Sequence, residues 1–214
     1  PVAEARSMGI HESQSLFCEM QLGHHPAFLA QIAPRIRAHF GEQAALAPAN
    51  LEKLYNRVEP GLIRVDADEV TYPAHVILRY ELERDLIEGR IEVADIPALW
   101  DAKMQQWLGL STKGNYQNGC MQDIHWTDGS FGYFPSYTLG AMYAAQLRFA
   151  LERELGDMGQ LIAAGRLPEI FGWLGRHIWS QGSLHSTDEL IRRATGEALN
   201  PQWLRKHLEQ RYLK

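Results

Sequence analysis

A short polar run near the start of the sequence, GIHESQS (residues 9–15), holds side chains that can bind metal ions or move protons. The carboxylate of Glu12 is of a type that binds divalent metals. A competing interpretation is electrostatic, because the positive end of the helix dipole stabilises a glutamate in the first turn of a helix. No two histidines in the sequence are four residues apart, so the HExxH zinc motif is absent and no second ligand is evident.

A single arginine stands out in the segment LIRVDAD (residues 62–68), just before an expected helix. The planar guanidinium of Arg64 can hold a substrate carboxylate through two parallel hydrogen bonds. The alternative is a local salt bridge with Asp66 or Asp68, and the spacing alone favours that alternative.

The third candidate group lies in the segment GCMQDIHW (residues 119–126) and the aromatic stretch after it. Asp123 is placed to orient His125, which would leave the other ring nitrogen for a substrate or a developing oxyanion. Tyr133 and Tyr137 could donate hydrogen bonds to the same charge. Both features have plain structural alternatives, since His–Asp pairs and Phe/Tyr-rich loops also stabilise folds.

The elements that position these side chains are expected to be helices. Helical periodicity, capping residues and glycine or proline stops predict a series of helices. The first runs from Ser7 or Gly9 to about Leu22, and a second stretch follows the break at residues 23–26 and ends at Phe40. The others are Asn50–Val58, a long helix from Asp66 to Gly89, 96–108, about Tyr137 to Leu155, Ser186–Gly196 and a last helix that starts at Asn200-Pro201. In the long helix, Val70, Ala74, Ile77, Leu82 and Leu86 are the expected buried stripe. The irregular segment 111–137 is the expected site-bearing loop.

Composition limits the possible functions. The 214 residues, 45% hydrophobic and 22% charged, are enough for one large helical unit with a buried core. A net charge of -5 with scattered Arg and Lys argues against a nucleic-acid partner. Cys18 and Cys120 are far apart, which fits a reducing compartment and disfavours thiolate zinc sites. No leader or membrane-spanning run is evident, so we expect a cytoplasmic protein without a membrane partner.

Three motifs in order, HESQS (11–15), IRVDAD (63–68) and GCMQDIHW (119–126), resemble signature motifs of the M32 metallocarboxypeptidases, the Taq or thermostable carboxypeptidase family. The flanking segments DADEVTYPAHVILRYELE and GSFGYFPSYTLG are similar as well. The resemblance covers nearly all of the chain and adds to the independent interpretation of the residues.

The resemblance implies a cleft-shaped α-helical zinc metallopeptidase that releases C-terminal amino acids from peptides, commonly as a homodimer, with zinc or cobalt. In such enzymes the metal polarises the scissile carbonyl and activates water. Two ligands come from an HExxH helix and the third from the glutamate of the HES motif. The implied roles are metal binding by Glu12, binding of the substrate C-terminus by Arg64, Gln122 and Asp123, and catalysis by His125 with Tyr133 or Tyr137.

The sequence departs from the family pattern in two places. HExxH is absent, so residues 1–214 are expected to be one helical unit, the C-terminal half of the catalytic domain, cut before the other metal ligands. SLFCEM follows HESQ where the family more often has Arg and Trp. We expect this chain alone to bind no metal and to be inactive. The alternative is a non-catalytic helical module for dimerisation or peptide binding.

Overall fold

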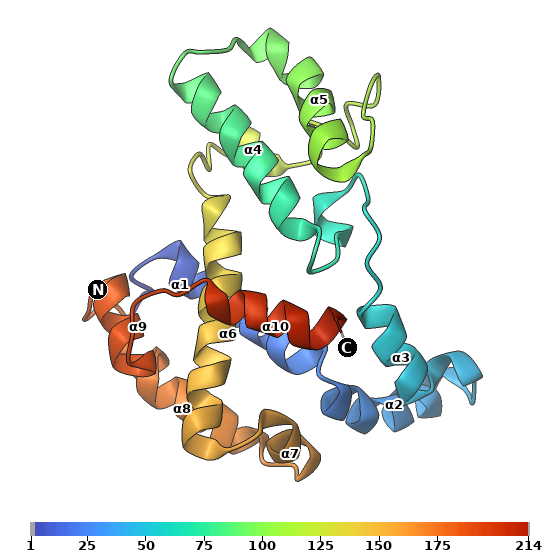
Figure 1. Ribbon diagram of the computed structural model, residues 1–214, viewed down its shortest axis with the longest axis vertical. Helices are drawn as coiled ribbons and strands as arrows, with labels where there is room; N and C mark the ends of the chain where they lie inside the picture. Colours follow the sequence, from blue (N-terminus) through green and yellow to red (C-terminus); the bar gives the residue numbers. More distant parts are fainter. Residues whose placement is uncertain (1–2, 214) are drawn as a thin grey trace. The chain divides into compact units, whose positions relative to one another are not determined.

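The computed structural model describes residues 3–213 and shows α-helices joined by short 3-10 turns, with no strand among those residues (Figure 1). The mainly α-helical class predicted from the sequence is therefore confirmed. Every helix in this part of the chain is too short or too polar to cross a bilayer.

The chain divides into two compact units. The first contains the residues up to Asn56 and those from Leu139 onward, and the second contains Arg57–Thr138. The helices of the first unit are α1 (Met8–Leu16), continued by a π-helix (Phe17–Gly23), α2 (Pro26–Phe40), α3 (Pro48–Tyr55), most of α6 (Pro135–Leu155), α7 (Met158–Ala163), α8 (Leu167–His177), α9 (Thr187–Thr195) and α10 (Gln202–Tyr212).

The main core of the first unit is built on α6. Leu147 and Leu151 of this helix are fully buried and pack with residues of α1, the π-helix, α7, α8 and α9, including Phe17 and Trp173. A smaller core lies between α2 and α3. The predicted helix from Ser7 is confirmed in its start, because the Ser7 hydroxyl accepts a hydrogen bond from the Ile10 N–H and caps α1.

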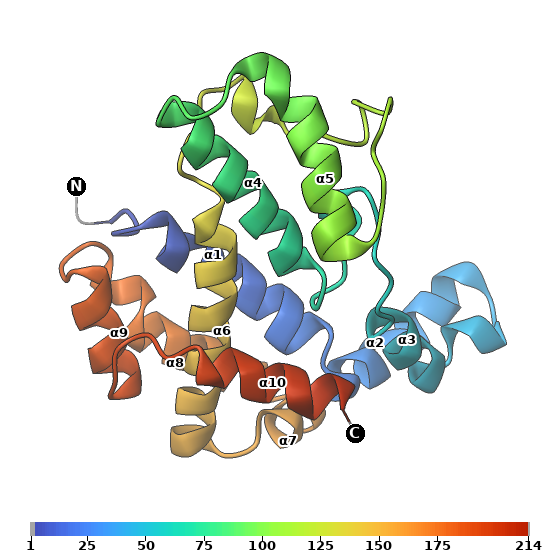
Figure 2. The ribbon, with the colours of Figure 1, turned by 45° about the horizontal axis from the view of Figure 1, so that its top comes forward.

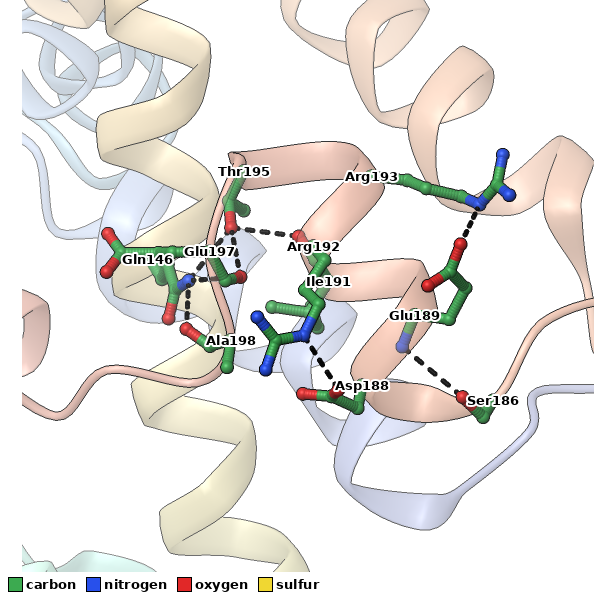
Figure 3. Close-up of polar contacts among 10 residues, drawn as sticks. All are labelled: Gln146, Ser186, Asp188, Glu189, Ile191, Arg192, Arg193, Thr195, Glu197 and Ala198. Carbon is green, nitrogen blue, oxygen red and sulfur yellow. Dashed lines mark hydrogen bonds and ion pairs between the residues drawn. The ribbon is translucent and has the colours of Figure 1, made fainter.

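The predicted cap and stop of α9 are confirmed (Figure 3), whereas the last helix, α10, begins at Gln202, one residue after the predicted Pro201. Ser186 caps α9 by accepting from the Glu189 N–H, and the helix ends at Gly196, whose φ of 88° is a left-handed conformation suited to glycine. The Gln146 amide of α6 donates to the Thr195 hydroxyl and to the Ala198 carbonyl. These bonds attach the end of α9 to the core helix.

The second unit contains α4 (Tyr72–Ile87), α5 (Ile96–Leu108) and the first residues of α6, with 3-10 turns at Arg64–Asp66, Val93–Asp95 and Ile124–Trp126. Helices α4 and α5 lie side by side (Figures 1 and 2). Their core contains Leu78, Leu82, Trp100 and Met104. Loop 109–134 packs its Cys120 against this core, so the segment predicted to carry the site is fixed to a helical pair.

Two predicted helix starts are wrong. The helix expected from Asp66 begins at Tyr72, because Asp68 accepts hydrogen bonds from the Val70 and Thr71 N–H groups and ends the preceding turn. The helix expected from Asn50 begins at Pro48, since proline is pre-organised for a first turn.

The buried face of α4 also differs from the predicted apolar stripe. Val70 and Ile77 are exposed, whereas Arg79 and Glu83 are buried and form an ion pair one turn apart. A search for apolar periodicity overlooks such a face, because charged residues are counted as outward-pointing.

Candidate functional site

The residues of the candidate site in the second unit come from segments that are distant in sequence. Arg64 starts a 3-10 turn before α4. Asp123 precedes another 3-10 turn in the long loop, His125 lies within that turn, and Tyr137 lies in the first turn of α6. The fold of this unit brings these segments together around the start of α4, where Tyr72 contributes its phenol.

Arg64 pairs with Asp123 rather than with the nearby Asp66 or Asp68 that spacing had favoured. Its Nε and Nη2 donate to the Asp123 Oδ1, each at 2.9 Å, and its Nη1 donates to the Tyr72 hydroxyl at 2.7 Å. The side chains of Arg64 and Asp123 are only 10% and 4% exposed. A buried pair of this kind is stable only while both partners are present.

The side chain of Gln122 binds the backbone of Arg64. Its Oε1 accepts from the Arg64 N–H at 2.7 Å, and its Nε2 donates to the carbonyls of Leu62, Asn118 and Gly119 at 3.0 to 3.1 Å. The amide thus bridges the segment before α4 and the long loop. In this structure Gln122 orients Arg64.

His125 is bonded to Tyr137 and not to Asp123. Its Nε2 lies 3.2 Å from the Tyr137 hydroxyl, and its ring packs within 4.9 Å of the Phe134 ring centre and 5.7 Å of that of Tyr133. The prediction that Asp123 orients His125 is therefore wrong. Asp123 binds Arg64, and His125 binds Tyr137. Aromatic rings of the α6 start cover both pairs, since Arg64 also lies over Phe134 and Tyr137.

Burial and neighbouring charges determine the protonation states of Arg64, Tyr72 and His125. Burial lowers the pKa of Arg64, but the charges of Tyr72 and Asp123 and the hydrogen bonds to them outweigh this effect and raise the pKa. Burial raises the pKa of Tyr72 to about 12, although Arg64 opposes it. Burial also lowers the pKa of His125, so this ring is neutral near pH 7. The charged or titratable groups around His125 are Arg64, Arg79, Asp123, Asp128, Tyr133 and Tyr137.

Sequence reasoning missed His75 and Tyr72, which lie in the first turn of α4. His75 is 2% exposed, and burial lowers its pKa, with the charge of Arg64 acting in the same direction. The sequence carried a partial signal, because TYPAH falls within a segment that resembles the family. The predicted helix begins too early, however, so these first-turn residues of α4 fall in its middle.

The thermal stability of the chain is expected to fall between pH 7 and pH 5. His75 and His125 have pKa values lowered by burial, so the unfolded chain, with histidine pKa values of about 6.5, binds protons that the folded chain does not. This stability is fully present above pH 6.5 or so and is lost as the pH falls toward the folded-state values. Unfolding midpoints at pH 7, 6 and 5 should decline less steeply in His75→Gln than in the parent. Equal slopes in the two proteins would contradict the assignment.

Glu12, the candidate metal ligand, lies on α1 in the first unit. Its side chain is 14% exposed, its Oε2 accepts from the Ser15 hydroxyl at 3.1 Å, and its Oε1 lies 4.0 Å from Nδ1 of His11. Within residues 3–213, no three His, Cys, Asp or Glu side chains are grouped so as to hold a metal ion. Glu12 has the right chemical type for a ligand, but these residues do not form a metal centre by themselves.

A close helix contact fixes the position of Glu12. At the point where α1 passes α6, a methyl group on Gly140 would lie 2.8 Å from Glu12 Cβ and 3.0 Å from the Glu12 carbonyl carbon. Only glycine allows this approach, because real Cβ atoms essentially never come so near another atom.

The chain matches the family model described as carboxypeptidase Taq (M32) metallopeptidase over residues 1–212. This chain belongs to the M32 metallopeptidase family. The three motifs that suggested the family are thus part of a match that extends over almost the whole sequence.

Relatives within the M32 family agree in sequence and in structure. The thermostable carboxypeptidase 1 of Thermus thermophilus is 41% identical over 99% of this chain, and that of Pyrococcus furiosus is 35% identical over all of it. Metallocarboxypeptidase 1 of Trypanosoma cruzi is 52% identical, with a TM-score of 0.95 over all of this chain and 45% of that structure. The chain spans only 41 to 42% of the length of the curated relatives that it matches.

Proposed function

We propose that residues 1–214 form the C-terminal part of a metal-dependent carboxypeptidase that releases C-terminal amino acids from peptides by metal-activated water. The match to the M32 family over residues 1–212 carries this proposal. The limited coverage of the relatives supports the view that the other metal ligands lie on further chain. In this proposal both units belong to one helical catalytic domain of a cytoplasmic homodimer.

Arg64 is proposed to bind the carboxylate at the C-terminus of the substrate. A guanidinium has five N–H groups, and the bonds to Asp123 and Tyr72 use one each on Nε, Nη1 and Nη2. One N–H on each Nη atom remains outside these bonds, which is the number that a two-oxygen carboxylate requires. Asp123 and Gln122 then act as positioning residues, because they hold the guanidinium and its backbone.

His125 and Tyr137 are proposed to stabilise negative charge that develops on the substrate carbonyl. The Nε2 of His125 and the Tyr137 hydroxyl lie 3.2 Å apart and share a hydrogen bond, so the two side chains form one polar group. Tyr133, whose ring centre is 5.3 Å from that of Tyr137, is the second candidate donor. The rings of Tyr133, Phe134 and Tyr137 pack around His125 and leave it half-buried.

Glu12 is proposed to be one ligand of a divalent metal ion, zinc or cobalt. When bound, such an ion supplies a Lewis acid for the carbonyl and for water. Catalytic zinc sites use three protein ligands, and residues 3–213 provide no such group. The contribution of this chain is therefore to provide a single carboxylate, to bind the peptide end and to orient it.

The purified 214-residue chain tests whether the metal site needs ligands from further chain. It is expected to retain no tightly bound metal after dialysis and to release no amino acid from blocked dipeptides, because one carboxylate does not hold zinc against water. Metal content by mass spectrometry and amino-acid release by chromatography measure the two quantities. One tightly bound zinc ion per chain, or hydrolysis that a chelator abolishes, would show that the site is complete within these residues.

A further inference from the structure

We propose that the buried ion pair of Arg79 and Glu83 on α4 is a positioning device that holds the loop segment 124–134 in the shape that presents His125. Both residues are charged yet almost inaccessible, with Arg79 0% and Glu83 5% exposed. The catalytic meaning of this device rests on the proposed function, whereas its physical test does not.

The carboxylate of Glu83 connects α4 to the loop. One oxygen, Oε2, accepts from Nη1 of Arg79, and the other, Oε1, accepts from the backbone N–H of Gly132. Each oxygen therefore has a distinct partner, one within the helix and one 49 residues further along the chain. The second bond fixes the loop immediately before Tyr133 and the start of α6.

The guanidinium of Arg79 contacts the same segment from its other side. It lies over the rings of Trp126 and Phe134, and the Trp126 indole N–H donates to the Cys120 carbonyl at 2.8 Å. Phe134 is 1% exposed and its ring centre is 4.9 Å from that of His125. The pair thus contacts both ends of segment 124–134, and Phe134 transmits its position to the imidazole.

Stability alone does not account for a buried pair at this place. Burial lowers the pKa of Arg79, against the effect of Glu83, which reflects the cost of removing the charge from water. Apolar residues of similar volume often replace a buried ion pair without loss of stability. Apolar side chains could fill the space beside Trp126, but they could not accept the hydrogen bond from Gly132. What the charges add is a defined loop conformation.

The double variant Arg79→Met with Glu83→Leu, made in the 214-residue chain, tests the proposal. The variant is expected to remain folded, with backbone amide exchange in segment 124–134 about tenfold faster and exchange in α5 unchanged. The His125 ring, followed by NMR, should titrate at a higher pH than in the parent, because it loses both its burial and the nearby cation of Arg79.

A matched control comes from the other ion pair of α4. Glu81 binds Lys103 of α5 and is 30% exposed, so Glu81→Gln should change neither the loop exchange nor the His125 titration. If that double variant does not fold, Arg79→Met with Glu83→Gln serves instead: the amide oxygen can still accept from the Gly132 N–H, no buried charge is left without its partner, and a smaller increase in exchange confined to the same segment is expected. Unchanged exchange and titration in a folded variant would overturn the proposal. An increase spread evenly over the second unit would also overturn it, because the pair would then be only structural. Neither readout depends on peptidase activity.

Discussion

Asp123→Ala is expected to lower the free energy of unfolding by about 3 to 5 kcal/mol, the range found when one partner of a buried ion pair is removed. The reason is the Arg64 guanidinium, which is 10% exposed and would remain charged with only Tyr72 to accept its hydrogen bonds. Urea unfolding of the 214-residue chain measures the effect. A loss below about 1 kcal/mol would place the pair in the range of surface salt bridges and contradict its burial.

The control for this prediction is an exposed pair with similar geometry. Arg205 and Glu209 on α10 are 71% and 48% exposed and bind at 2.7 Å, so Glu209→Gln should cost about 0.5 kcal/mol or less. A double variant, Asp123→Leu with Arg64→Met, completes the test. It should be more stable than Asp123→Ala, because no uncompensated charge remains buried, even though Arg64, the group proposed to bind the substrate carboxylate, would be lost.

Gly140→Ala is expected to destabilise the first unit by about 1 to 3 kcal/mol, the usual cost of overpacking. Alanine in the middle of a helix normally stabilises it by about 1 kcal/mol relative to glycine. Here the added methyl group would meet the backbone of Glu12 at 3.0 Å, and backbone atoms cannot rotate away as the end of a side chain can. Helix α1 must then move off α6, and Glu12 moves with it.

Gly172→Ala is the matched control. Gly172 lies within α8, and a methyl group there would find only the end of Arg176, at the ordinary distance of 3.6 Å. This variant should be as stable as the parent or up to about 1 kcal/mol more stable. Thermal unfolding distinguishes the two variants, because 1 kcal/mol corresponds to roughly 2 to 4 °C at this chain length. If Gly140→Ala stabilises the chain as Gly172→Ala does, the close approach at Glu12 is wrong.

Local signals in the sequence were sufficient for much of the fold. The Ser186 cap and the glycine end of α9 are both decided by residues within one turn of the boundary. The start of α4 was not predicted, since Asp66 and Asp68 are equally good caps by type. The backbone N–H groups that Asp68 meets decide between them, and these depend on the conformation of the turn.

Pairing between distant segments limited how much of the candidate site could be predicted from the sequence. The sequence singled out Arg64, Asp123, His125 and Tyr137, and the structure brings them together in one unit. It could not tell that Arg64 binds Asp123, which is 59 residues away, or that His125 binds Tyr137. Those partners follow from the packing of a loop on two helices. Local spacing instead favoured neighbours such as Asp66.

The burial of the charged residues of α4 also could not be predicted from the sequence. Arg79 and Glu83 have the spacing of an exposed salt bridge on a helix, and nothing in that spacing indicates burial. Trp126, Phe134 and the backbone of Gly132 make their burial possible, and these groups come from a loop about 50 residues away. Amphipathic periodicity identifies a buried face only when that face is apolar.

The proposed role of Glu12 as one ligand of a metal site shared with further chain can be tested in the protein encoded by the longest reading frame that contains residues 1–214. That protein should bind one divalent metal ion per chain and release C-terminal residues from peptides. Its Glu12→Gln variant should fold but lose at least about tenfold in metal affinity and activity, because a neutral amide replaces a charged ligand. A Glu12→Gln protein that retains one tightly bound metal ion and full activity would contradict the account.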